Sequence, residues 1–116
     1  MVNITYLSEP TENHIRLIVK GHAGQAEHGK DIVCSAVSII TYTIAENVRR
    51  LCTNHIGCIS LEEGDSEVDI FFNSDREYEK IGGKIEAIVT GFEILSKSYP
   101  EYVTFNTNGK GESLNI

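Results

Sequence analysis

One cysteine and one histidine in this chain stand where a thiol nucleophile and its base could meet. His22 follows Gly21 at the end of a strand-like segment, and Cys34 lies three residues after Asp31, where an apolar segment with helical periodicity begins. Thiolates are stabilised near helix N-termini and beside a protonated imidazole, because both supply positive potential. The placement therefore indicates nucleophilic thiol chemistry with a histidine base, whereas the alternative is a small buried cysteine and a strand-end histidine.

Three polar residues next to Cys34 are expected to support this chemistry. Asp31 is a favourable N-cap, which would place Cys34 in the first helical turn with free backbone N–H groups around its sulfur. The N–H groups of Cys34 and Ser35 would then stabilise an oxyanion. Ser38 lies one turn after Cys34 and either lines the pocket or bonds the backbone of the preceding turn.

Residues 23–30, between the histidine and the helix, are rich in small and polar residues. They form either an ordinary polar loop or a lid, in which Gly24 and Gly29 would be the hinges that let it close over a peptide. The segment contains neither of the glycine patterns that bind phosphates, so it does not indicate nucleotide binding.

A second group of residues, Cys52, His55 and Cys58, is spaced by threes and could be read as a metal-ligand set. It straddles a predicted helix end and strand start, and the sequence shows no evident fourth ligand. We therefore expect no metal and no other cofactor.

The composition limits the classes of function and location. The chain has 10 Lys and Arg against 17 Asp and Glu, a net charge of −7, which disfavours direct binding to nucleic acid and favours a cationic partner.

No apolar run approaches the roughly 18 residues of a membrane span, and the first ten residues do not resemble a signal peptide. Three cysteines are an odd number, which argues against a disulfide framework. We expect a cytoplasmic protein with no membrane association.

The periodicity predicts the elements that position these residues. Alternating apolar residues predict strands near 2–7, 15–20, 57–61, 67–73 and 102–107, and three- and four-residue steps predict helices over 33–51 and 76–98. Gly82 and Gly83 inside the second helix would each cost about 1 kcal/mol relative to alanine, which indicates close packing there. The order ββαββαβ predicts one α+β domain over residues 1–116, with a mostly antiparallel sheet and two helices packed on one face.

The stretch from Gly21 to Ser38 resembles the signature of the ribosomal-processing cysteine protease family. That signature is a Gly-His-Ala triplet, a glycine-containing loop, and Asp-Ile-Val-Cys followed by small residues and a serine. The residues in register are Gly21, His22, Ala23, Gly29, Asp31, Ile32, Val33, Cys34, Ala36 and Ser38.

The resemblance implies a cysteine endopeptidase with a dyad of His22 and Cys34, a mobile lid and a homodimer, with Ile39 or Phe71 as candidate interface residues. The implied substrate is the short N-terminal extension of bacterial large-subunit ribosomal protein twenty-seven, with apolar and aromatic residues before the cut and basic ones after it. Candidates for an acidic rim that would suit such a basic segment are Glu27, Glu62, Glu63, Asp65 and Glu67.

Two other functions use the same residues. In a non-catalytic ribosome-assembly or protein-binding module, the motif would only build the fold. In a thiol redox sensor, Cys34 would be oxidised and later reduced, but Cys52 lies too far along the same predicted helix to resolve it.

Overall fold

The computed structural model describes residues 1–22, 28–52 and 55–108, and for residues 28–31 and 55 it describes the backbone alone. The elements follow the predicted order, with one short 3-10 helix added between the first two strands. Their bounds are β1 (Val2–Glu9), η1 (Pro10–Glu12), β2 (His14–Lys20), α1 (His28–Leu51), β3 (His55–Glu62), β4 (Asp65–Phe72), α2 (Asp75–Ser98) and β5 (Val103–Thr107).

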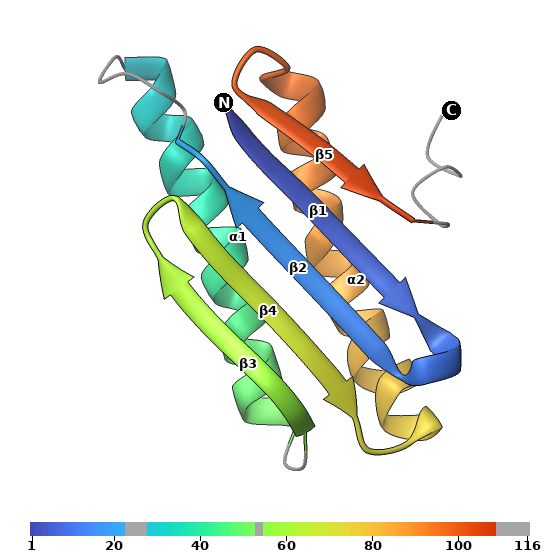
Figure 1. Cartoon of the computed structure of the whole chain (residues 1–116). Helices are drawn as coiled ribbons and strands as arrows, with labels where there is room; N and C mark the ends of the chain where they lie inside the picture. Colours follow the sequence, from blue (N-terminus) through green and yellow to red (C-terminus); the bar gives the residue numbers. More distant parts are fainter. Residues whose placement is uncertain (23–27, 53–54, 109–116) are drawn as a thin grey trace.

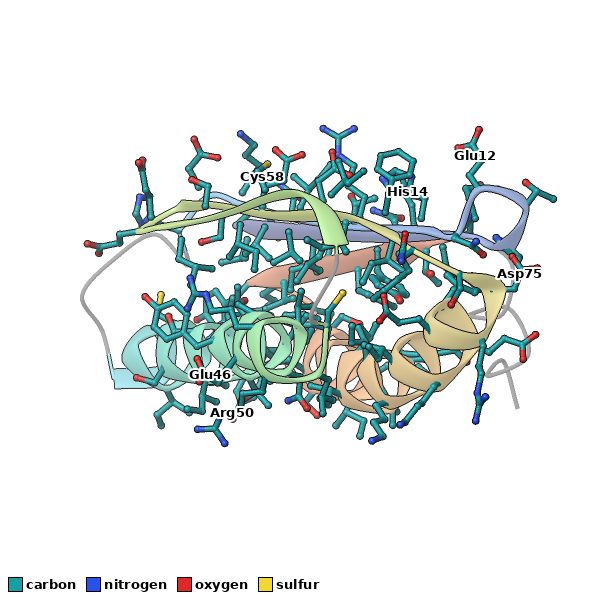
Figure 2. All side chains as sticks on the ribbon, turned by 90° about the horizontal axis from the view of Figure 1, so that it is seen from below. Glu12, His14, Glu46, Arg50, Cys58 and Asp75 are labelled. Carbon is teal, nitrogen blue, oxygen red and sulfur yellow. The ribbon has the colours of Figure 1, made fainter. Side chains whose placement is uncertain are left out.

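The five strands form one sheet in the order β3-β4-β2-β1-β5. Three of the four pairings are antiparallel, and only β1 and β5 run parallel. Figure 1 shows α1 and α2 crossing the same side of this sheet, and Figure 2 shows the two layers edge-on. The predicted α+β fold with two helices on one face of a mostly antiparallel sheet is confirmed.

The core lies between the sheet and the two helices, because each strand turns alternate side chains toward them. Fully buried residues come from both layers, including Ile4, Ile15 and Val68 on the strands and Ile44 and Phe92 on the helices. Burying apolar surface contributes about 25 cal/mol per Å². This contact therefore holds α1 at a fixed place under the sheet.

The opposite face of the sheet carries several charged pairs, beside a stacked contact between the rings of His14 and Phe71. Lys20 Nζ lies 2.6 Å from Asp65 Oδ1, and Arg16 Nε lies 2.8 Å from Glu67 Oε2. Cys58 and His14 lie on this outer face in Figure 2. The predicted alternation along β4, with Glu67 and Asp69 on one face and Val68 and Ile70 on the other, is therefore confirmed by burial as well.

The second helix starts at a clear cap. The Ser74 side chain accepts a hydrogen bond from the Glu77 N–H, which satisfies one of the free donors of the first turn. The reason suggested for Gly82 and Gly83 is wrong, because a Cβ built on either residue meets no heavy atom within 4 Å. In the described part of the chain, neither helix is long and apolar enough to cross a membrane.

Candidate active site

Helix α1 begins earlier than the sequence indicates. It starts at His28, three residues before Asp31, so Cys34 lies in its second turn and the assignment of Asp31 as the N-cap is wrong. In an α-helix each N–H beyond the first four donates to the carbonyl four residues before it. The amides of Cys34 and Ser35 therefore fall inside this ladder, and the free N–H groups expected around the sulfur are not there.

His22 is held by main-chain contacts on both sides. Its carbonyl oxygen accepts a hydrogen bond from the Met1 amino group, at 2.6 Å. The N–H of Gly21 donates to the carbonyl of Gly64, at 2.9 Å, which ties the end of β2 to the turn between β3 and β4. Gly21 has a φ of +98°, and a Cβ there would overlap the Met1 carbonyl. Glycine is therefore needed immediately before the histidine.

The imidazole of His22 packs against the same turn. A Cβ on Gly64 would lie 2.6 Å from the ring carbon Cε1 and closer still to Nε2. The φ of Gly64 is +75°, which also favours glycine. The turn is fixed in addition by Ser66, whose buried hydroxyl donates to the Glu62 carbonyl at 3.0 Å. The β3–β4 turn is thus the surface against which the histidine ring rests.

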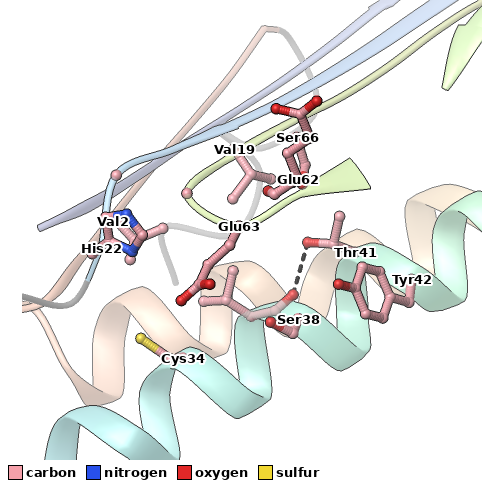
Figure 3. Close-up of a pocket in the computed structure, with 13 residues that line it drawn as sticks. Val2, Val19, His22, Cys34, Ser38, Thr41, Tyr42, Glu62, Glu63 and Ser66 are labelled. Atoms are coloured by element: carbon pink, nitrogen blue, oxygen red, sulfur yellow. Dashed lines mark hydrogen bonds between the residues drawn. The ribbon is translucent and has the colours of Figure 1, made fainter. Parts of the chain in front are cut away.

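His22 and Cys34 line one cavity of about 270 Å³ between the sheet and α1. The cavity runs from the end of β2 and the β3–β4 turn along α1, and Figure 3 shows the thiol of Cys34 on the helix below His22. Its lining residues are Val2, Val19, Gly21, His22, Cys34, Val37, Ser38, Thr41, Tyr42, Glu62, Glu63, Gly64 and Ser66. A thiol, an imidazole and an open cavity together can perform acyl transfer at a carbonyl.

Of the other predicted site residues, some line the cavity and others lie outside it or outside the described residues. Ser38 lines the cavity, whereas Ser35 is exposed on α1 and is not among the lining residues. Gly29 lies in the first turn of α1 rather than in a loop, and Gly24 lies outside the described residues. Of Asp31 the structure describes only its backbone, within α1.

The remaining cysteines lie away from the cavity and from each other. Cys52 is buried at the end of α1, with its Sγ 3.5 Å from Glu77 Oε1, whereas Cys58 is exposed on the outer face of the sheet. The two sulfur atoms therefore do not share a site, and in the described residues no group of three His, Cys, Asp or Glu is arranged to hold a metal.

Sequence reasoning missed the part played by Gly64, and it missed Thr41 and Tyr42 as lining residues. The sequence does signal a turn at Gly64, but the contact with His22 joins two segments far apart in the chain. Thr41 carries no separate signal either: its hydroxyl donates to the Val37 carbonyl at 2.7 Å, an ordinary bond within a helix.

Comparison with known proteins shows the class of this fold and site. The family model described as cysteine protease Prp matches residues 1–104. The ribosomal processing cysteine protease Prp of Mycoplasma pneumoniae is 26% identical over 102 residues, which cover 88% of this chain and 96% of that protein.

Solved structures agree with this match. The crystal structure of SMU.848 from Streptococcus mutans has a TM-score of 0.71 and 26% identity, and the match covers 92% of this chain and 93% of the other. The ribosomal processing protease Prp of S. aureus, solved with a substrate peptide, has a TM-score of 0.71 at 18% identity, with 93% of this chain and 100% of the other covered. The second structure shows that the fold is shared.

This protein is therefore a cysteine protease, and the cavity that holds Cys34 and His22 is its candidate active site. More particularly, the chain belongs to the cysteine protease Prp family of ribosomal processing enzymes. The family resemblance carried by residues 21–38 is confirmed by a match that extends over nearly the whole chain.

Proposed function

We propose that Cys34 is the nucleophile and His22 the general base and acid of a peptide-cleaving dyad. The observation that carries this proposal is that the two side chains, from different elements, line one cavity. Cys34 comes from the second turn of α1, and His22 from the end of β2. Both positions are anchored, the helix by its buried face and the histidine by the β3–β4 turn.

The reaction follows from these two groups. His22 removes the thiol proton, and the Cys34 sulfur attacks the carbonyl carbon of the scissile bond. The C–N bond then breaks, and His22 gives its proton to the leaving amine, which leaves an acyl thioester on Cys34. Water attacks this thioester while His22 accepts a water proton, and the carboxylate product departs as the thiol is restored. Ser38, which lines the cavity beside Cys34, contacts the bound peptide.

The proposed substrate is the short N-terminal extension of bacterial large-subunit ribosomal protein twenty-seven, which is removed during ribosome biogenesis. Three observations support a basic segment of a ribosomal protein as the partner. The relative from M. pneumoniae is named a ribosomal processing protease. The chain carries a net charge of −7, and the described cavity is lined by acidic but no basic residues other than His22. The same charge disfavours direct contact with nucleic acid.

The test is mass spectrometry of a synthetic peptide that spans the extension of the host's own ribosomal protein, incubated with purified protein. We expect one cut by the wild type and none by Cys34→Ser or His22→Ala. Cys58→Ser is the matched control, because Cys58 is also an exposed cysteine but lies on the outer face of the sheet. A cut that persists in Cys34→Ser would overturn the dyad. An uncut peptide, with Cys34 alkylated faster than Cys58 by iodoacetamide, would overturn the substrate alone.

We further propose that the enzyme works in the cytoplasm as a homodimer. Two apolar side chains are candidates for the interface: Ile39 on α1 is 63% exposed, and Phe71 on the outer face of the sheet is 40% exposed. Sedimentation of the wild type should give a dimer, and either Ile39→Asp or Phe71→Asp should shift it toward the monomer. A monomeric wild type at micromolar concentration would overturn this part of the proposal.

A further inference from the structure

The β3–β4 turn presents two neighbouring glutamates in opposite directions. Glu62 pairs in register with Asp65, whose carboxylate lies on the outer face beside Lys20, so Glu62 shares that face. Figure 3 shows the carboxylate of Glu63 on the other side of the turn, pointing down into the cavity toward α1 and Cys34. One carboxylate of this turn therefore faces the candidate site, and its neighbour faces away from it.

The two groups also differ in the charges around them. On the outer face, Asp65 and Glu67 are neutralised by Lys20 and Arg16. Among the residues whose side chains the structure describes, no Lys or Arg lines the cavity and no cationic group lies within 4 Å of the Glu63 carboxylate. Within this described part of the site, Glu63 thus brings a negative charge without an ion-pair partner to the place where a peptide would bind.

We infer that Glu63 is a specificity-determining residue that selects a lysine or arginine side chain of the substrate next to the scissile bond. This inference rests on the proposed dyad, because it places Glu63 beside the atoms that cut the bond. A cationic side chain that reaches the cavity finds a charge-assisted hydrogen-bond acceptor at Glu63, and a carboxylate side chain there is repelled.

The test compares kcat/KM for three peptides that carry Lys, Gln or Glu at one residue next to the cut, once with the change before the cut and once with the change after it. For the wild type we expect the Lys peptide to be preferred over the Gln peptide by about fivefold, which is the upper range for a solvent-exposed charge pair. Glu63→Gln should abolish this preference, so that the Lys and Gln peptides give equal kcat/KM. Glu63→Lys should prefer the Glu peptide. Asp65→Asn is the matched control, because it removes the same charge beside the same turn from a residue that pairs with Lys20 on the outer face and does not line the cavity, and it should keep the wild-type preference.

Each other result is decisive against the inference. Equal loss of the Lys preference in Glu63→Gln and Asp65→Asn would assign the effect to the overall charge rather than to Glu63. A Glu63→Gln variant that slows all three peptides by the same factor would make Glu63 a positioning residue for His22. An unchanged preference would remove Glu63 from recognition and leave the dyad standing, whereas absence of cleavage by the wild type would count against the proposed function itself.

Discussion

The position of His22 depends on residues that have no chemistry of their own. Gly64 allows the turn to lie against the ring, and Gly21 allows the chain to pass close to the Met1 carbonyl. Both have a positive φ, so a side chain at either residue would add backbone strain to the steric overlap. The precision of the site is thus set by glycines outside the predicted dyad.

Gly64→Ala should impair catalysis far more than folding. The new methyl group would overlap the His22 ring and displace it, and a displacement of about 1 Å can cost on the order of 100-fold in rate. Steady-state cleavage of the substrate peptide measures the loss in kcat, and urea unfolding serves as the control. The stability should fall by only about 1–2 kcal/mol. A folded variant with the wild-type rate would show that the turn does not position the histidine.

Tyr6 should make the protein sensitive to alkali. Burial, with the negative charge of Glu86 as a second cause, raises the pKa of Tyr6 above its ordinary value. The unfolded chain loses this proton near pH 10, whereas the folded chain keeps it, so the free energy of unfolding falls as the pH rises above about 10. Urea unfolding from pH 8 to pH 11 should show this decline.

The control is Tyr6→Phe, in which the decline should be smaller. The hydroxyl of Tyr6 is buried near Ser8 and makes no hydrogen bond of regular geometry with the described residues, so its removal should change stability at neutral pH little. A decline of equal slope in Tyr6→Phe would assign the alkaline effect to other groups.

At the scale of the elements, α1 and α2 are both amphipathic helices of equal length, but they have different roles in the molecule. The first carries Cys34, Ser38 and Thr41 to the cavity, whereas the second contributes to the core and, in the described residues, nothing to the cavity lining. Helix α1 extends nearly two turns before Cys34. The packing of its buried face against the sheet, rather than a cap at Asp31, therefore determines where the Cys34 thiol lies relative to the sheet.

Gly83→Ala should stabilise α2. The residue is exposed in a helix interior, and its new methyl group would meet no atom within 4 Å, so only the propensity gain of about 1 kcal/mol remains. Gly91→Ala is the matched control on the same helix. Its Cβ would lie 3.2 Å from Ile40 Cδ1 on α1, so its gain should be smaller or negative. Thermal unfolding of both variants measures the difference, and equal shifts in Tm would contradict the packing seen between the helices.

At the scale of the whole molecule, the cavity belongs to a strongly acidic protein. The net charge of −7 attracts a cationic peptide at distances larger than any contact, and salt screens this attraction within about 10 Å at 0.1 M. The value of kcat/KM for a basic peptide should therefore fall several-fold between about 0.05 and 0.5 M NaCl. A peptide of the same length without charge is the control and should change little. A basic peptide with no salt dependence would show that long-range attraction does not guide binding.

The sequence alone was sufficient for the order of the elements, the sheet with two helices on one face, and the stretch that pairs a histidine with a cysteine. These properties are encoded locally, because the period of apolar residues and the turn residues lie within each segment. The proximity of residues 22 and 34 also follows from a short connection between adjacent elements.

Other features depend on contacts between distant segments, which no local pattern contains. The three-dimensional packing places Gly64 against the His22 ring, directs the carboxylate of Glu63 into the cavity toward Cys34, and leaves Gly83 open to solvent. It also starts α1 before Asp31, although Asp31 is a good cap by its chemistry. Packing of the sheet on the helices outweighs these local preferences, because the apolar area that it buries contributes more to the free energy of folding than a single helix cap or a single glycine does.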